Sequence, residues 1–201
     1  MDQTAWDERY AGPELVWGSG PNCFVAGELA ALPPGRAIDL GTGEGRNAIW
    51  LAERGFAVTA VDFSRVGLAR AAELAAERGV SVDWVHADLL GYQPTPGGYD
   101  LVLIAYIQLP ADRLTELVRT AAAAVAPGGT LLAVGHDRDN LARGYGGPKD
   151  ISVLWTLPSV TAGLDGLSVR RAEQVTRTVA TPDGDRTAID TLVRAERPAP
   201  H

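Results

Sequence analysis

The residues best suited to chemistry in this sequence form a glycine-rich turn. Asp39 is followed at alternate positions by Gly41, Gly43 and Gly45. The residues just before Asp39 include the apolar side chains of a strand, and residues 46–53 have the spacing of an amphipathic helix. A glycine turn between a strand and a helix is the setting in which backbone amides bind a cofactor of the nucleotide type. The sequence therefore predicts a cofactor-binding loop here.

The spacing of this turn favours one class of cofactor over another. A dinucleotide-binding turn of the form G-x-G-x-x-G would need its third glycine at the position of Arg46. Glu44 would also place a carboxylate beside a bound pyrophosphate, at a helix end that favours anions. Both observations favour a cationic ligand, and they leave a nicotinamide-dependent oxidoreductase as the less favoured alternative.

Further acids follow the next two predicted strands. Residues 56–61 form a strand-like run that ends at Asp62, and the strand-like residues 82–87 are followed by Asp88. Taken singly, each acid also fits a plain helix cap or loop residue. Together with the glycine turn, their order resembles the class I methyltransferases that use S-adenosylmethionine. The resemblance covers about residues 35–135.

This resemblance implies how the cofactor is held. In that family the glycine turn admits the methionine end, and the acid before it, here Asp39, lies near the ammonium group. The acid of the next strand accepts hydrogen bonds from the ribose hydroxyls, and the acid after the following strand frames the adenine. The cofactor-binding residues implied for this chain are Asp39, Gly41, Gly43, Gly45, Asp62, Phe63, Asp88, Leu89, Ala105, Trp17 and Tyr10.

Trp17 and Tyr10 belong to residues 1–34, which we expect to form a helical cover over the site. This segment resembles, more loosely, the cover of methyltransferases of the tellurite-resistance and thiopurine types. Aromatic rings near a sulfonium cation contribute about 0.5–2 kcal/mol through cation–π attraction. The alternative is that both residues only fasten the N-terminal helix to the sheet. Residues 140–148, which contain three glycines, are either a second, acceptor-side lid or a mobile connector.

His136 is the candidate catalytic residue, as a general base. It follows the predicted strand at residues 130–134, and an acid, Asp137, is adjacent to it. An imidazole is suited as a general base to take a proton from a hydroxyl, thiol or amine during methyl transfer. The plainer alternative is a solvated loop histidine that takes no part in proton transfer.

The sequence favours a small molecule as methyl acceptor. The loop after Ile104 lacks the acid or asparagine, two prolines and aromatic residue that methyltransferases acting on the amino groups of nucleic-acid bases carry. Cys23 precedes the first strand, whereas C5-pyrimidine methylation needs a cysteine within the site. A net charge of −7 also disfavours binding to nucleic acid. A non-catalytic module that binds S-adenosylmethionine is the remaining hypothesis.

Strand and helix patterns alternate along this region, which predicts a single Rossmann-like, doubly wound α/β domain with a seven-stranded, mostly parallel sheet. Residues 167–179 and 186–195 are both strand-like and flank a Pro-Asp-Gly-Asp turn, so they should form an antiparallel C-terminal hairpin. We place the methyltransferase domain at residues 35–197 and a frayed tail at residues 198–201.

The composition of the 201 residues, 46% hydrophobic and 21% charged, is that of one globular domain. A single cysteine excludes an intrachain disulfide, and with three histidines it is too small a set for a Cys/His metal cluster, so we expect no metal. No apolar run approaches the roughly 18 residues of a membrane span, and the N-terminus lacks the pattern of a signal peptide. We therefore predict a cytoplasmic protein without a membrane partner, and the oligomeric state stays open.

Overall fold

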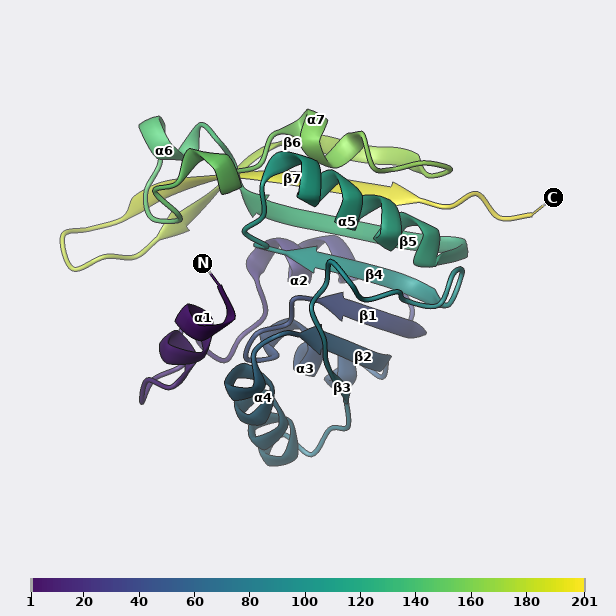
Figure 1. Ribbon diagram of the computed structural model, residues 1–201, viewed down its shortest axis with the longest axis horizontal. Coiled ribbons are helices and arrows are strands. Elements are labelled where there is room, and N and C mark those ends of the chain that lie inside the picture. Colours follow the sequence, from purple (N-terminus) through teal and green to yellow (C-terminus); the bar gives the residue numbers. More distant parts are fainter. Residues whose placement is uncertain (1, 201) are drawn as a thin grey trace.

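The computed structural model describes residues 2–200, which form a seven-stranded sheet flanked by helices (Figure 1). The strands are β1 (Arg36–Leu40), β2 (Ala57–Asp62), β3 (Asp83–His86), β4 (Tyr99–Ala105), β5 (Val125–His136), β6 (Ser168–Val179) and β7 (Arg186–Glu196). Their order across the sheet is β3-β2-β1-β4-β5-β7-β6. β1 to β5 are parallel, and β7 runs antiparallel to both β5 and β6. The predicted α/β fold with its antiparallel final hairpin is confirmed.

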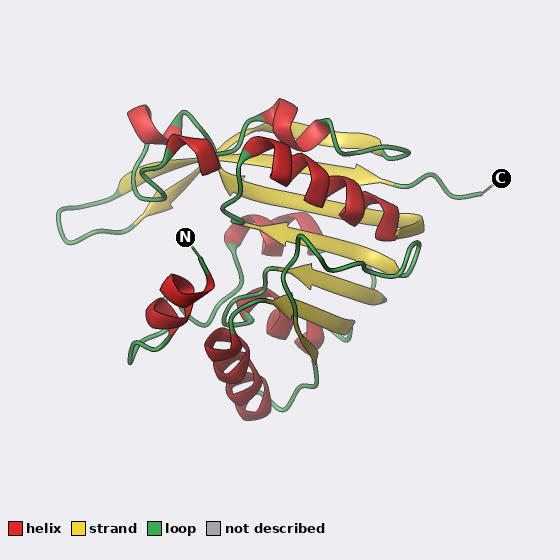
Figure 2. Cartoon of the chain, in the orientation of Figure 1, coloured by secondary structure: helices red, strands yellow, loops and turns green. Residues whose placement is uncertain are grey.

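Helices cover both faces of this sheet (Figure 2). They are α1 (Gln3–Tyr10), α2 (Cys23–Leu29), α3 (Arg46–Glu53), α4 (Arg65–Glu77), α5 (Ala111–Ala124), α6 (Asn140–Arg143), the 3₁₀ helix η1 (Ile151–Val153) and α7 (Leu157–Thr161). Side chains of α5 and α7 are buried against one face of the sheet, and side chains of α2 and α3 against the other. Ser64 caps α4, as its position in the sequence predicts, because its hydroxyl accepts a hydrogen bond from the Gly67 amide at 3.0 Å.

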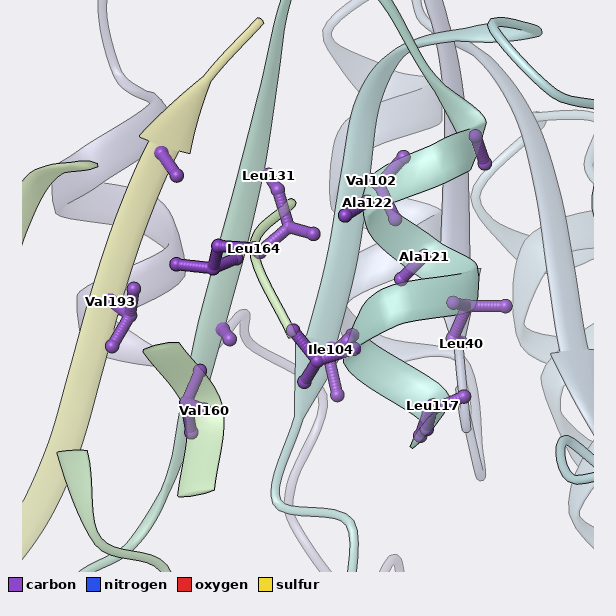
Figure 3. Packing of buried hydrophobic residues seen from close by; sticks show 14 of the residues in the cluster. Leu40, Val102, Ile104, Leu117, Ala121, Ala122, Leu131, Val160, Leu164 and Val193 are labelled. Atoms are coloured by element: carbon purple, nitrogen blue, oxygen red, sulfur yellow. The ribbon is translucent and has the colours of Figure 1, made fainter. Parts of the chain in front are cut away.

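The central strands are apolar on both faces because helices cover both. In β4, Val102 and Ile104 contribute to the cluster under α5, whereas Leu101 and Leu103 contribute to the cluster on the opposite face. Figure 3 shows the first of these clusters, with side chains of α5 such as Leu117 lying beside Ile104. Because β1 to β5 are parallel, their carboxyl ends lie at one edge of the sheet.

The C-terminal hairpin reaches past that edge. β7 pairs with β5 only as far as the pair His136 and Asp190, whereas β6 and β7 stay paired to Val179 and Arg186 (Figure 1). The free part of the hairpin therefore projects beside the loops that follow the parallel strands. Residues 198–200 have no regular secondary structure, and residues 1 and 201, the ends of the predicted cover and tail, lie outside the described residues.

No helix within residues 2–200 has the length and apolar character needed to cross a membrane.

Candidate functional site

A cavity of about 590 Å³ opens at the carboxyl edge of the parallel strands. This is where ligands bind in open α/β sheets. Of the residues that the sequence singles out, those in the cavity wall are Gly41, Gly43, Asp62, Phe63, Asp88, Leu89, Ala105, Trp17, Tyr10 and His136. Asp39 and Gly45 do not reach the wall. The fold therefore gathers most of the predicted site residues in one place.

Two of the three glycines in the turn border the cavity. Gly41 and Gly43 have φ angles of +80° and +56° and face the cavity. A Cβ atom would lie 2.0 Å from Ile107 Cδ1 at the first position and 2.6 Å from the Tyr10 hydroxyl at the second. Gly45 instead packs against the Ala71 side chain, where a Cβ would lie 2.8 Å away. The third glycine is needed for packing and for its φ of +79° rather than for ligand contact.

Asp39 lies behind the turn instead of facing the cavity. Its side chain is 1% exposed, and its Oδ2 accepts a hydrogen bond from the Thr42 hydroxyl at 2.7 Å. The resemblance to methyltransferases suggests a contact with the cofactor's ammonium group, but in this fold the carboxyl group is enclosed by the turn. Burial raises the pKa of Asp39 to about 7.

The raised pKa of Asp39 predicts a pH dependence of stability. Its folded-state pKa of about 7 lies above the ordinary value of roughly 3.9 for the unfolded chain. A raised carboxyl pKa favours folding at low pH, and that contribution is lost as the pH rises through about 7. We expect the free energy of unfolding of Asp39→Asn, measured in urea, to fall less between pH 4 and pH 7 than that of the wild type. If the free energy of unfolding falls equally with pH in the variant and the wild type, Asp39 does not have the raised pKa.

Asp62 connects the glycine turn to the start of α4. Its Oδ2 accepts from the Gly43 amide and its Oδ1 from the Ser64 amide, each at 2.8 Å. A carboxylate has about four acceptor sites, so both oxygens keep capacity for a ligand in the cavity. Burial raises the pKa of Asp62, and the hydrogen bonds from Ser64 and Gly43 act against that shift.

Asp88, Leu89 and Phe63 continue the cavity wall on the side of the glycine turn and Asp62. Asp88 Oδ1 accepts a hydrogen bond from the Leu90 amide at 3.0 Å, which fixes the loop after β3. The Phe63 carbonyl oxygen lies 2.9 Å from His86 Nε2. Backbone and apolar groups next to a fixed acid make a slot suited to a purine ring.

The N-terminal helix α1 lies over the glycine turn. Tyr10 is 5% exposed, with its hydroxyl above Gly43, and Trp6 stacks on it with the ring centroids 5.4 Å apart. The Arg9 guanidinium lies 4.9 Å from the centroid of the Trp17 ring. Trp6, Tyr10 and Trp17 therefore line the cavity with aromatic side chains, and an aromatic contact with a cofactor stays a prediction.

Two charged residues fasten this cover. Glu44, which is 3% exposed, accepts a hydrogen bond from the Val16 amide at 2.9 Å and lies 3.1 Å from Arg70 Nη1. Arg70 Nη1 also donates to the carbonyls of Tyr10 and Gly12, at 2.6 and 2.9 Å. The buried charge of Glu44 is thus compensated by an ion pair with Arg70. This pair anchors the cover to α4.

Loss of this anchor should open the cover. Hydrogen bonds to charged groups contribute roughly 1.5–3 kcal/mol, so we expect Arg70→Ala to raise the rate of chymotrypsin cleavage at Trp17 by about tenfold or more. The control is Arg65→Ala on the same helix, because Arg65 is exposed and makes no ion pair within the part of the chain that the structure describes. Equal cleavage rates in the two variants would show that Arg70 does not hold the cover.

His136 forms the other side of the cavity together with a buried acid. Its Nδ1 lies 3.2 Å from Asp190 Oδ1, an ion-pair distance, and the two side chains are 9% and 0% exposed. Asp190 Oδ2 accepts hydrogen bonds from the Tyr106 hydroxyl and from Arg177 Nε, both at 2.8 Å. Asn22 Nδ2 in turn donates to the Tyr106 hydroxyl at 3.2 Å.

The sequence did not predict that Asp190, Tyr106 and Arg177 would cluster beside His136. The acid adjacent to His136, Asp137, turns away and accepts hydrogen bonds from Thr191 and Gln174, so the acid beside the imidazole is Asp190. One signal was present: Asp190 occupies an inward position of β7 between the buried Ala188 and Leu192, where an apolar residue is expected.

Residues 140–148 form part of the wall. Asn140, which is 2% exposed, donates to the Gly146 carbonyl at 2.9 Å and accepts from the Ile189 amide at 2.8 Å. Gly147 packs against the His136 ring, where a Cβ would lie 3.1 Å from the imidazole. Tyr145 lines the cavity and is 46% exposed. Movement of this segment as a lid stays a prediction.

Comparison with known proteins agrees with this geometry. Residues 37–129 match the methyltransferase domain family. This matched stretch is a methyltransferase domain, in agreement with the resemblance to the class I S-adenosylmethionine-dependent methyltransferases. This finding goes against the nicotinamide-dependent oxidoreductase alternative.

Two curated relatives that are similar to parts of this chain have different functional names. The ubiquinone biosynthesis O-methyltransferase of Caulobacter sp. (strain K31) is 32% identical over 112 residues, 51% of this chain and 41% of that protein. The ribosomal protein L11 methyltransferase of Pelotomaculum thermopropionicum is 35% identical over 131 residues, 61% of this chain and 41% of that protein. The matches span less than half the length of each relative.

A solved structure shows the same fold over almost the whole chain. The N-methyltransferase NodS from Bradyrhizobium japonicum WM9, in complex with S-adenosyl-L-homocysteine, aligns with a TM-score of 0.76 and 16% identity over 98% of each chain.

The cavity fits S-adenosylmethionine, the cofactor of this methyltransferase family. Gly41 and Gly43 allow close approach to the backbone, and Asp62 retains acceptor capacity for hydroxyl groups. Asp88 lies in the wall on the same side as Asp62, where it can frame the adenine. Among residues 2–200 no group of three potential metal ligands is found.

Proposed function

We propose that this methyltransferase transfers a methyl group from S-adenosylmethionine to an oxygen, sulfur or nitrogen atom of a small molecule. The observation that supports this proposal is the single cavity whose wall contains both Asp62 and His136. Its volume of about 590 Å³ lies within the range of small-molecule sites, roughly 300–1,000 Å³. The aromatic cover and residues 145–148 restrict access from two sides.

Asp62, Gly41 and Gly43 would hold the cofactor, which when bound supplies an electrophilic methyl group on a positively charged sulfur. The chain itself then has to align the acceptor and exclude water, because proximity alone lowers such a barrier by several kcal/mol. Tyr10 and Trp17 would enclose the methionine end, as the family resemblance implies.

His136 would take the acceptor's proton at Nε2. Its Nδ1 faces Asp190, and Nε2 makes no hydrogen bond to the residues that the structure describes. A carboxylate beside Nδ1 favours the tautomer with the proton on that atom, which leaves Nε2 as the base. Nε2 would receive this proton as the acceptor atom gains the methyl group, and the methyl carbon–sulfur bond would break so that S-adenosylhomocysteine leaves.

The base role predicts a large effect of one substitution. Removal of a positioned general base costs about 10²–10⁴-fold in rate, so we expect His136→Ala to slow methyl transfer by at least about a hundredfold. Binding of S-adenosylhomocysteine should not change, since His136 lies on the far side of the cavity from Asp62. A variant with the wild-type rate would show that the acceptor needs no base here.

Methyl transfer is tested with S-adenosylmethionine that carries a tritiated methyl group. The purified chain is incubated with cell metabolites below the size of proteins, and separately with ribosomal RNA and with ribosomal proteins. The proposal predicts label in the small-molecule fraction only. Label in ribosomal RNA or protein would contradict the acceptor class, and tight cofactor binding with no transfer to any fraction would favour a non-catalytic module.

A further inference from the structure

One side chain in the cavity has more hydrogen-bonding capacity than its neighbours use. Arg177 lies on β6 opposite Ala188, so its side chain reaches the diagonal neighbour Asp190 on the same face of the hairpin. Its Nε donates to Asp190, whereas neither Nη group makes a hydrogen bond within residues 2–200. The side chain is 25% exposed and lines the cavity. The outer edge of the guanidinium therefore lacks a partner.

Contacts with Asp190 and Tyr106 hold the Arg177 side chain in position. Asp190 is fully buried between Arg177, Tyr106 and His136, and the guanidinium carbon lies 5.7 Å from the centroid of the Tyr106 ring. Burial by itself lowers the pKa of Arg177, but its neighbours Tyr106 and Asp190 outweigh burial and raise it. Arg177 is thus a fixed cation with two free donor groups.

The acids in the cavity wall all lie on one of its two sides. Glu44, Asp62 and Asp88 are on the side of the glycine turn, where Arg9 and Arg46 also line the cavity. The opposite side contains Arg177 and His136, and it continues into apolar side chains. Those apolar residues are Leu109, Pro148 and Val179. This second side suits a molecule with an apolar body and a negative group, although the whole chain has a net charge of −7.

We propose that Arg177 binds a carboxylate, or another planar oxyanion, of the methyl acceptor, so that the acceptor is a small anionic molecule with an apolar body. This inference rests on the proposed function. The guanidinium fork matches the two oxygens of a carboxylate, and Arg is suited to such bidentate contacts because of its planar donor geometry. Asp190 is a positioning residue, because it holds both Arg177 and His136 and orients them toward one bound molecule.

The cofactor has a carboxylate of its own, and the test must separate the two sources. Arg46 is the first residue of α3, next to the glycine turn, and it also lines the cavity. It is better placed for the methionine end than Arg177, which projects from the hairpin. A substitution of Arg177 should therefore affect the acceptor and spare the cofactor.

The probes are benzoate and its uncharged counterpart benzamide, titrated calorimetrically into the protein saturated with S-adenosylhomocysteine. Because hydrogen bonds to charged groups contribute roughly 1.5–3 kcal/mol, we expect the wild type to bind benzoate about tenfold or more tightly than benzamide. Arg177→Gln should bring the two affinities within about twofold, because the fork is lost. The matched control is Arg186→Gln on the same hairpin, where Arg186 is exposed and forms no ion pair with the described residues. This control should keep the preference for benzoate.

Titration with S-adenosylhomocysteine alone separates the two proposals. Failure of the wild type to bind it would overturn the proposed function and this inference with it. Normal cofactor binding with equal affinities for benzoate and benzamide would overturn only the anionic acceptor. Weaker S-adenosylhomocysteine binding by a folded Arg177→Gln variant would also overturn it, because Arg177 would then bind the carboxylate of the cofactor.

Discussion

Replacement of Asp62 by alanine is expected to weaken the binding of S-adenosylhomocysteine by roughly 1.5–3 kcal/mol, or about ten- to a hundredfold. The carboxylate lies in the cavity wall and is 5% exposed, so water replaces it poorly as a partner for ribose hydroxyls. The dissociation constants of wild type and variant, measured by calorimetry, check this expectation.

Asp62 also accepts hydrogen bonds from the Gly43 and Ser64 amides, so its loss disturbs the glycine turn as well. An S-adenosylhomocysteine analogue without the two ribose hydroxyls separates the two effects. A thermodynamic cycle that combines the Asp62 substitution with the removal of these hydroxyls isolates the direct interaction between Asp62 and the ribose. The substitution should weaken the analogue much less than the parent ligand, because only the disturbance of the turn remains. If the variant weakens the analogue as much as the parent ligand, Asp62 supports the turn and makes no contact with the ribose.

Replacement of Asp190 by alanine is expected to lower the free energy of unfolding by about 3 kcal/mol, since breaking a buried ion pair costs roughly 3–5 kcal/mol. The expected loss of stability lies at the lower end of this range because Arg177 is 25% exposed, so that water compensates part of its charge. The Tyr106 hydroxyl also loses its acceptor, at 2.8 Å in the wild type. Unfolding in urea, followed by circular dichroism, gives the change.

Two further variants give this prediction its controls. Asp190→Asn retains one acceptor oxygen and should lose less stability than Asp190→Ala. Asp183→Ala, in the exposed turn of the same hairpin, should leave the free energy of unfolding within about 0.5 kcal/mol of the wild type. An Asp190→Ala variant as stable as Asp183→Ala would mean that the buried group contributes little net stability.

The sequence predicted the framework of this molecule well because its signals are local. The strand, glycine turn and helix at residues 36–53 are adjacent in the chain, and Asp62 follows its own strand directly. Parallel strands bring such strand ends to one edge of the sheet whatever the details of packing. The positions of Asp62 and Asp88 in the cavity wall therefore follow from topology.

The acceptor side could not be predicted in the same way. Asp190 and Arg177 lie on different strands of the hairpin, and their contact with Tyr106 depends on register and on how far the hairpin projects beyond β5. Tyr106 itself has a φ of +58°, an uncommon conformation for a residue other than glycine, and nothing in its neighbours in the sequence signals it. Asp39 was placed by family resemblance, and its enclosure by the turn is a matter of packing.

The cofactor assignment is decided by calorimetric titration of the wild-type chain with S-adenosylmethionine, S-adenosylhomocysteine and NADH. Both adenosyl ligands should bind in the micromolar range and compete for one site per chain, whereas NADH should not bind. Binding of NADH, with no heat from either adenosyl ligand, would contradict the assignment of this cavity to methyl transfer.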